Sequence, residues 1–132
     1  MSNITLLGAA EIREIAAELD LHPTKGLGQN FVIDSNTCQK IVRLGVVNQG
    51  DHVVEIGPGI GSLTLALLQL ADRVTAIEID ERLAKRLPET ARSHGVADRV
   101  LEVINDDALR IQHLSGEPNK RSEEHTSELQ SH

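Results

Sequence analysis

Three glycines at alternate positions, Gly57, Gly59 and Gly61, follow a short apolar segment and precede a segment that can form a helix. Glycine allows a tight turn and a close approach of the backbone to a bound molecule, because no Cβ is in the way. The first turn of the following helix offers N–H groups without intrahelical partners. The segment from Val53 to Thr64 therefore predicts a nucleotide site, the alternative being a turn with no ligand.

Acidic residues accompany this turn at three places. Glu55 lies two residues before Gly57, near the end of the expected strand. A carboxylate there would repel a pyrophosphate, whereas it would suit a ligand with an ammonium and a sulfonium, such as S-adenosylmethionine. Glu78 ends the next expected strand, where an acid can accept hydrogen bonds from the ribose hydroxyls of NAD or of S-adenosylmethionine. Asp107, just after a third strand, is placed to accept a bond from an adenine amine.

The glycine spacing helps to separate two nucleotide classes. The dinucleotide fingerprint is G-x-G-x-x-G, whereas this chain has G-P-G-I-G-S, with Ser62 in the sixth position. S-adenosylmethionine is favoured, and an NAD-dependent oxidoreductase stays open as an alternative. Other acids have plainer interpretations: Asp80 is expected to cap the following helix, and Asp106 with Asp107 could form a solvated turn.

The elements that must position these residues alternate between strands and helices. Apolar residues at helical spacing, with capping residues ahead of them, predict the helices, and short β-rich apolar runs predict the strands. Strand, helix, strand, helix, strand indicates parallel β-α-β units, and hence an α/β, Rossmann-like fold whose parallel sheet is truncated after about three strands. The expected strands are 52–56, 73–79 and 100–104, and the expected helices are 9–19, one starting at Asp34 or Ser35, 62–70, and 81–93 with a break or kink at Pro88.

Composition limits the function classes. The chain has 132 residues and a formal net charge of −7, so it lacks the basic surface of an autonomous nucleic-acid binder. No apolar run is long enough for a membrane span, no signal peptide is recognisable, and a cytoplasmic location is expected. Cys38 is the single cysteine and is expected to be a buried hydrophobe. The six histidines show no ligand spacing, so no metal site is expected.

Four segments, LGQNFVID, VVEIGPGIGSLTLALL, VTAIEID and VINDDAL, resemble in order and spacing the start of the ribosomal RNA adenine dimethyltransferases. The resemblance covers residues 6–111 and is closest to the bacterial small-subunit enzymes, with the macrolide-resistance rRNA methylases as relatives. Q-N-F ahead of E-I-G-P-G is its most specific part. The resemblance implies S-adenosyl-L-methionine as the cofactor. It implies that Asn30 and Val32 line the methionine part of the cofactor, that the backbone of Gly57 approaches the cofactor, and that Gly59 and Gly61 shape the turn. It also implies that Glu78 holds the ribose and that Asp107, with Ala108 beside it, holds the adenine amine.

Other residues of the matching segments have two interpretations. Gln29 and Phe31, the only aromatic residue, could serve the structure rather than the cofactor. Lys25 could contact RNA phosphate in the parent enzyme or could be a solvated loop charge.

The resemblance also implies a reaction. The parent enzyme would transfer four methyls to two adjacent adenosines near the 3′ end of small-subunit rRNA, in an immature ribosomal subunit. A large-subunit rRNA methyltransferase and a non-catalytic cofactor- or RNA-binding homologue stay open. The family motif that holds the target adenine, Asn-Leu-Pro followed by Tyr or Phe, is absent from these 132 residues. No catalytic residue is therefore assigned, and the chain is expected to be inactive and poorly stable, with an unpaired strand edge.

The last twelve residues, RSEEHTSELQSH, are polar and lack apolar periodicity. They resemble the translation of a common sequencing adapter, the alternative being a disordered C-terminus. The expected organisation is therefore N-terminal helices and the GQNF loop over 1–51, the first half of the methyltransferase core over 52–120, and a non-native tail over 121–132.

Overall fold

The computed structural model describes residues 3–21 and 35–110. Predictions made for Lys25, Gln29, Asn30, Phe31 and Val32, and for the tail 121–132, lie outside the described residues.

A three-stranded parallel sheet forms the centre of the molecule. Its strands are β1 (His52–Ile56), β2 (Arg73–Ile77) and β3 (Leu101–Ile104), in the order β1-β2-β3. Parallel neighbours require crossover connections, and these contain α3 (Ser62–Leu68) and α4 (Glu81–Ser93). The register pairs Ile56 with Ile77 and Ile77 with Ile104, so the carboxyl ends of the three strands lie at one edge of the sheet. The expected α/β fold is confirmed.

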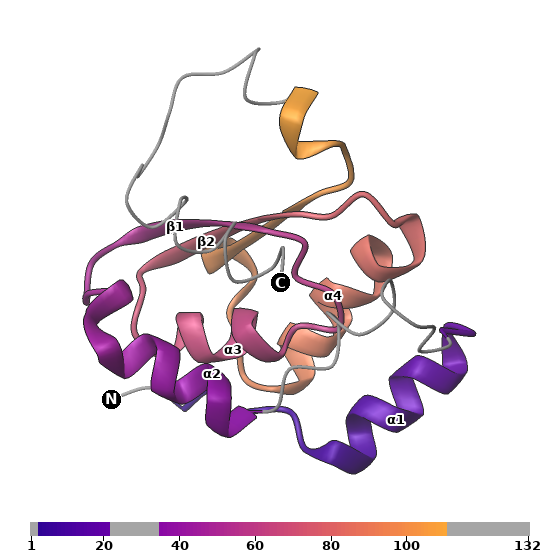
Figure 1. Ribbon diagram of the computed structural model, residues 1–132, viewed down its shortest axis with the longest axis horizontal. Coiled ribbons are helices and arrows are strands. Elements are labelled where there is room, and N and C mark those ends of the chain that lie inside the picture. The colour runs from indigo at the N-terminus through magenta and orange to yellow at the C-terminus, as the bar shows by residue number, and fades with distance from the viewer. Residues whose placement is uncertain (1–2, 22–34, 111–132) are drawn as a thin grey trace.

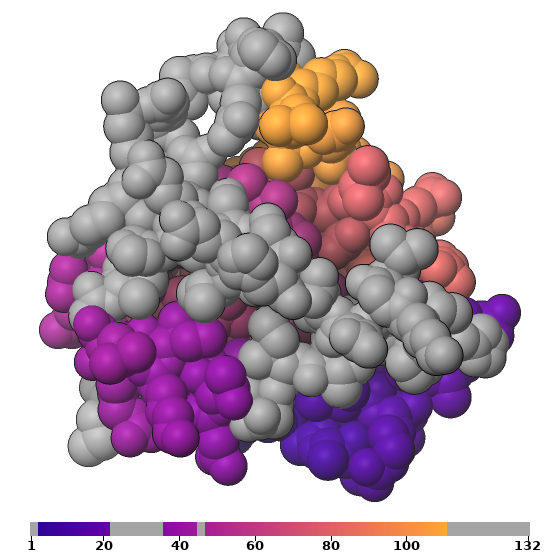
Figure 2. Space-filling model, viewed as in Figure 1, coloured from indigo at the N-terminus to yellow at the C-terminus, as the bar shows by residue number. Residues whose placement is uncertain are grey.

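Apart from the short helical turn that begins at Ala108, the helices lie together below the sheet in Figure 1. Helix α2 (Ser35–Ile41) packs on α3 and continues into a π-helical turn, Val42–Val46. Helix α1 (Ala9–Glu18) lies at the edge of the molecule, as Figure 2 shows. The core between the helices and the sheet is aliphatic and contains Cys38, as expected. Its most buried members are Ile15, Cys38, Val53, Leu65, Ala66, Leu67 and Val74.

Several expected boundaries were wrong by one or two residues. The second strand ends at Ile77 rather than at Ile79, because the Glu78 side chain turns back to accept backbone N–H groups. The π-helical turn carries the second helix on to Val46. Pro88 does not interrupt α4, which runs on to Ser93 with its apolar side, including Leu83, buried. None of the described helices has the length and apolarity that a membrane span requires.

Candidate functional site

The glycine turn follows β1 and leads into α3. Gly57, Gly59 and Gly61 all have positive φ, of 71°, 60° and 115°. The amide of Gly57 donates to the carbonyl of Ile77, 2.9 Å away, and this bond fixes the start of the turn to β2. A Cβ at Gly61 would lie 2.7 Å from Cδ1 of Leu87 on α4. Glycine at this position therefore permits both the left-handed backbone and the close packing of α3 on α4.

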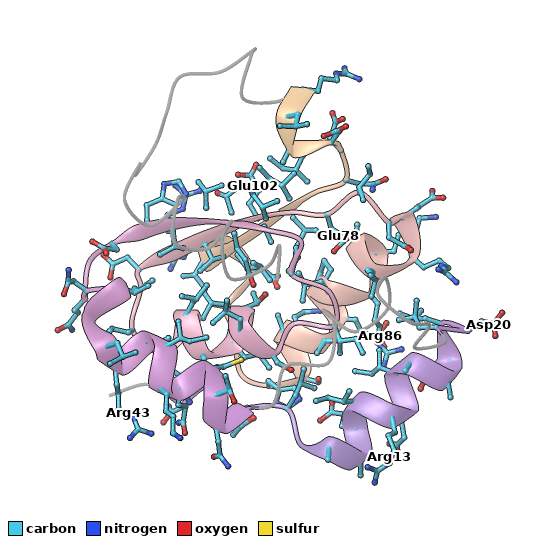
Figure 3. The ribbon with its side chains drawn as sticks, in the orientation of Figure 1. Arg13, Asp20, Arg43, Glu78, Arg86 and Glu102 are labelled. Atoms are coloured by element: carbon cyan, nitrogen blue, oxygen red, sulfur yellow. The ribbon has the colours of Figure 1, made fainter. Side chains whose placement is uncertain are left out.

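Glu78 follows β2 directly, beside the glycine turn. Its side chain is held at both oxygens: Oε1 accepts from the amide of Gly59 at 3.1 Å, and Oε2 accepts from the amide of Asp80 at 2.9 Å. The side chain of Asn105, just after β3, donates to the carbonyls of Glu78 and Ile79 and so fixes the backbone there. Burial raises the pKa of Glu78, and the amides oppose that rise because they stabilise the carboxylate. Figure 3 labels Glu78 near α4.

Glu55, on β1, is fully buried. Its Oε1 accepts a hydrogen bond from the hydroxyl of Thr64 on α3, and Oε2 has no partner among the described residues. Burial, with a contribution from the nearby Glu78, raises the pKa of Glu55 to about 8, although the Thr64 bond opposes the rise. The sequence suggested a charged carboxylate, whereas this environment keeps the carboxyl mainly protonated at neutral pH.

The remaining acids of the site serve helix ends. Asp80 caps α4 as expected, because its side chain accepts from the amides of Arg82 and Leu83. Oδ1 of Asp107 accepts from the amide of Leu109 at 2.9 Å and so caps a helical turn that begins at Ala108. The adenine role of Asp107 stays a prediction beside this capping role.

One residue of the site escaped the sequence reasoning. Ile79 was expected inside a strand, yet it lies beyond β2 with 70% of its surface exposed. An exposed large apolar residue beside Glu78 can contact the flat, apolar face of a base. The available signal was its position between two acids, Glu78 and Asp80, which are joined by a bond from the Asp80 amide to the Glu78 carboxylate.

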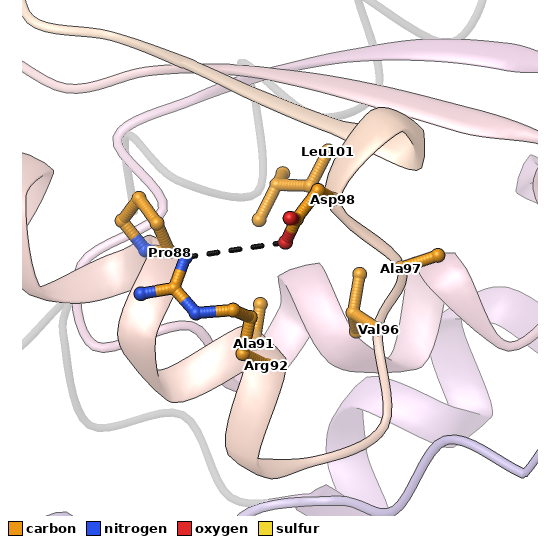
Figure 4. Close-up of a pocket in the computed structure, with 7 residues that line it drawn as sticks. All are labelled: Pro88, Ala91, Arg92, Val96, Ala97, Asp98 and Leu101. Atoms are coloured by element: carbon orange, nitrogen blue, oxygen red, sulfur yellow. Dashed lines mark ion pairs between the residues drawn. The ribbon is translucent and has the colours of Figure 1, made fainter.

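A second concave feature lies elsewhere. A pocket between the C-terminal half of α4 and the start of β3 contains the ion pair of Arg92 with Asp98, drawn in Figure 4. Because it is next to the amino end of β3, it is separate from the glycine turn. Within residues 3–21 and 35–110, no group of three or more His, Cys, Asp or Glu residues could hold a metal ion.

Comparison with known proteins identifies the family. Residues 22–129 match the family described as ribosomal RNA adenine dimethylase. The chain belongs to this family. Among curated dimethylase relatives, the ribosomal RNA small subunit methyltransferase A of Corynebacterium jeikeium is 57% identical over 108 residues, and that of Streptomyces coelicolor is 56% identical over 113 residues.

The chain is short compared with these dimethylase relatives. The two alignments cover 82% and 84% of this chain, but only 34% and 39% of the relatives. The chain therefore spans little more than a third of their length.

Solved structures agree with the membership of the dimethylase family. The 23S rRNA methyltransferase ErmE is 37% identical with a TM-score of 0.52, over 67% of this chain and 33% of its own. A dimethyladenosine transferase from Plasmodium falciparum is 31% identical with a TM-score of 0.54, over 65% of this chain and 29% of its own. The O-methyltransferase TomG from Streptomyces achromogenes, solved with S-adenosylmethionine, is 19% identical with a TM-score of 0.65, over 88% of this chain and 50% of its own. The fold is that of S-adenosylmethionine-dependent methyltransferases.

Proposed function

We propose that this chain is the cofactor-binding half of an rRNA adenine dimethyltransferase that modifies two adjacent adenosines near the 3′ end of small-subunit rRNA. The observation that carries the proposal is the fixed carboxylate of Glu78, held by the amides of Gly59 and Asp80 beside the glycine turn. Membership of the dimethylase family, and relatives named as small-subunit enzymes, supply the substrate class.

The residues present fit S-adenosylmethionine. Glu78 would accept hydrogen bonds from the ribose hydroxyls, and Ile79 would contact a face of the adenine. Asp107, with Ala108 beside it, would accept a bond from the adenine amine. Gly57 would approach the cofactor by its backbone, while Gly59 and Gly61 shape the turn. When bound, the cofactor supplies an electrophilic methyl group on its sulfonium. Asn30 and Val32 would line the methionine part.

Glu55, mainly protonated in the free chain, would favour this cationic cofactor by ionising when the cofactor binds. The carboxyl has one oxygen without a partner and a pKa of about 8, so a positive group placed nearby would stabilise its ionised form. A pyrophosphate would do the opposite. This difference supports S-adenosylmethionine over NAD.

The chain itself is proposed to bind cofactor without methylating RNA. Orientation of the acceptor amine belongs, in the family pattern, to an Asn-Leu-Pro-aromatic motif, and these 132 residues contain none. Methyl transfer depends largely on positioning of the two reactants, so a cofactor site alone would be insufficient. Incubation of the chain with radiolabelled S-adenosylmethionine and small ribosomal subunits should therefore give no labelled rRNA, and incorporation would contradict this part of the proposal.

Binding measurements test the cofactor assignment. Calorimetric titration of the chain with S-adenosylmethionine and S-adenosylhomocysteine should give saturable binding, and NAD should neither bind nor compete. Saturable NAD binding without S-adenosylmethionine binding would favour an oxidoreductase instead. Absence of binding by all three ligands would contradict the proposed cofactor site.

A large-subunit target is the second candidate, favoured by the 37% identity to the 23S rRNA methyltransferase ErmE.

The tail 121–132 is proposed to be non-native, although the family match extends to residue 129. Sequencing of the source DNA past the codon for Lys120, in a library made without that adapter, tests the tail. A frame that continues into Asn-Leu-Pro-Tyr or -Phe would support the proposal, and one that encodes RSEEHTSELQSH and stops would refute it. The longer product could then be assayed on both ribosomal subunits.

A further inference from the structure

Arg82, in the first turn of α4, joins two distant parts of the chain. Its Nη1 donates to the carbonyl of Leu19 at 2.8 Å, at the end of α1. Its Nη2 donates to Oδ2 of Asp80 at 3.0 Å, in an ion pair. One guanidinium therefore connects the end of α1 to the residue that caps α4.

Asp80 in turn connects Arg82 to Glu78. While Oδ1 of Asp80 accepts from the amides of Arg82 and Leu83, the amide of Asp80 donates to Oε2 of Glu78. The other oxygen of Glu78 accepts from Gly59. A continuous series of hydrogen bonds thus runs from the end of α1, through Arg82 and Asp80, to the carboxylate of Glu78 and the glycine turn.

We propose that Arg82 is a positioning residue for the cofactor site: it fixes Asp80, and through its amide the carboxylate of Glu78, in the orientation that receives the ribose. This inference rests on the proposed function, since it assigns the ribose to Glu78. A guanidinium suits the role because its planar fork of donors can serve a carboxylate and a carbonyl together. A lysine ammonium lacks this fixed geometry.

Arg86, one turn further along α4, provides a matched control. It forms an ion pair with Glu18 on α1 and a longer one, of 3.9 Å, with Glu89. It therefore fixes α1 to α4 as Arg82 does, but its ion pairs are with Glu18 and Glu89 rather than with Asp80. Figure 3 labels Arg86 near α1. Replacement of Arg86 tests the docking of α1 alone, whereas replacement of Arg82 also releases Asp80.

Ligand binding provides the first test. The intact chain and its Arg82→Ala, Arg82→Lys and Arg86→Ala variants are titrated with S-adenosylhomocysteine and with its 2′-deoxyribose analogue. Arg82→Ala should weaken S-adenosylhomocysteine binding about five- to tenfold, the loss expected when the effect of one ordinary hydrogen bond is removed. Arg82→Ala should weaken binding of the analogue less. Arg82→Lys should bind S-adenosylhomocysteine more tightly than Arg82→Ala does, and the affinity of Arg86→Ala should stay within about twofold of that of the unmodified chain. Equal losses for both ligands, or equal losses in Arg82→Ala and Arg86→Ala, would overturn the inference.

Amide hydrogen exchange without ligand provides the second test. Arg82→Ala should speed the exchange of the amides of Asp80 and Gly59, which donate to Glu78. The amide of Gly57, which donates to the Ile77 carbonyl, should exchange as in the unmodified chain. Unchanged exchange at Asp80 and Gly59 would refute the role of Arg82. Absence of ligand binding by the unmodified chain would instead refute the proposed function, so the two failures are distinguishable.

Discussion

Thr64 donates its hydroxyl hydrogen to Oε1 of Glu55 across 2.5 Å, and both side chains are fully buried. This bond joins α3 to β1 behind the glycine turn. It satisfies only one oxygen of the carboxyl, so burial still disfavours the charged form. The site therefore contains a titratable group whose charge depends on pH in the neutral range.

Stability should fall as pH rises because of Glu55. Its pKa is raised in the folded chain from 4.5 to about 8, so the folded state binds this proton more tightly than the unfolded state does. The stabilising contribution is fully present below pH 4.5 and is lost as pH rises to about 8. The whole change is on the order of a few kcal/mol. Glu55→Gln, which mimics the protonated carboxyl, should remove this pH dependence and be more stable than the unmodified chain above pH 8.

Urea unfolding at pH 5, 7 and 9 measures this effect. Glu14→Gln, at an exposed position on α1, serves as the control and should keep the pH dependence of the unmodified chain. If Glu55→Gln and the unmodified chain lose stability in parallel between pH 5 and pH 9, the raised pKa of Glu55 is not the cause.

Gly61→Ala should destabilise the chain by roughly 1–3 kcal/mol, because alanine is strained at a φ of 115°. The added Cβ would also press on Leu87, which is itself buried. Thermal unfolding followed by circular dichroism measures the loss. Gly8→Ala is the matched control, since Gly8 has a φ of −92° and an added Cβ would meet nothing within 4 Å. Equal midpoints for Gly61→Ala and the unmodified chain would contradict the account of this turn.

Ile79→Ala should weaken cofactor binding without reducing stability. The residue is 70% exposed, so its truncation removes little of the folding energy. In the proposed complex it covers the adenine, and the loss of its apolar contact should lower affinity by roughly 1–2 kcal/mol, or about five- to thirtyfold. Calorimetry with S-adenosylhomocysteine measures the change in affinity, and urea unfolding measures the change in stability. Leu44→Ala, an exposed aliphatic residue on the π-helical turn, should leave affinity unchanged. Equal affinities of Ile79→Ala and Leu44→Ala would exclude the adenine contact.

Local sequence patterns predicted most of the fold. Alternating strands and helices have distinct periodicities, and a capping residue such as Asp80 is recognisable from its position ahead of an amphipathic helix. The glycine turn and Glu78 were recognisable for the same reason, since each lies at a fixed offset from a strand end. The end of β2 was not recognisable from the sequence, because Glu78 bonds to the distant Gly59 as well as to the nearby Asp80.

Long-range contacts escaped prediction. Arg82 bonds to Leu19, and Arg86 pairs with Glu18, although more than sixty positions separate the partners in each case. A single sequence contains no periodicity that relates such residues. The ionisation of Glu55 was equally hidden, because its pKa depends on burial in the folded chain and on Thr64 and Glu78.

His94, which follows α4 and is 9% exposed, should anchor the N-terminal segment. Its ring bonds through Nδ1 to the hydroxyl of Thr5 at 2.8 Å and through Nε2 to the carboxylate of Glu11 at 2.9 Å. His94→Ala should cost roughly 1–3 kcal/mol, because it removes two hydrogen bonds and buried volume. Hydrogen exchange should accelerate over residues 3–18 while β1 and β2 stay protected. His52→Ala, which removes a ring bonded to Thr75 instead, should leave residues 3–18 unchanged. If residues 3–18 exchange equally in both variants, His94 is not the anchor.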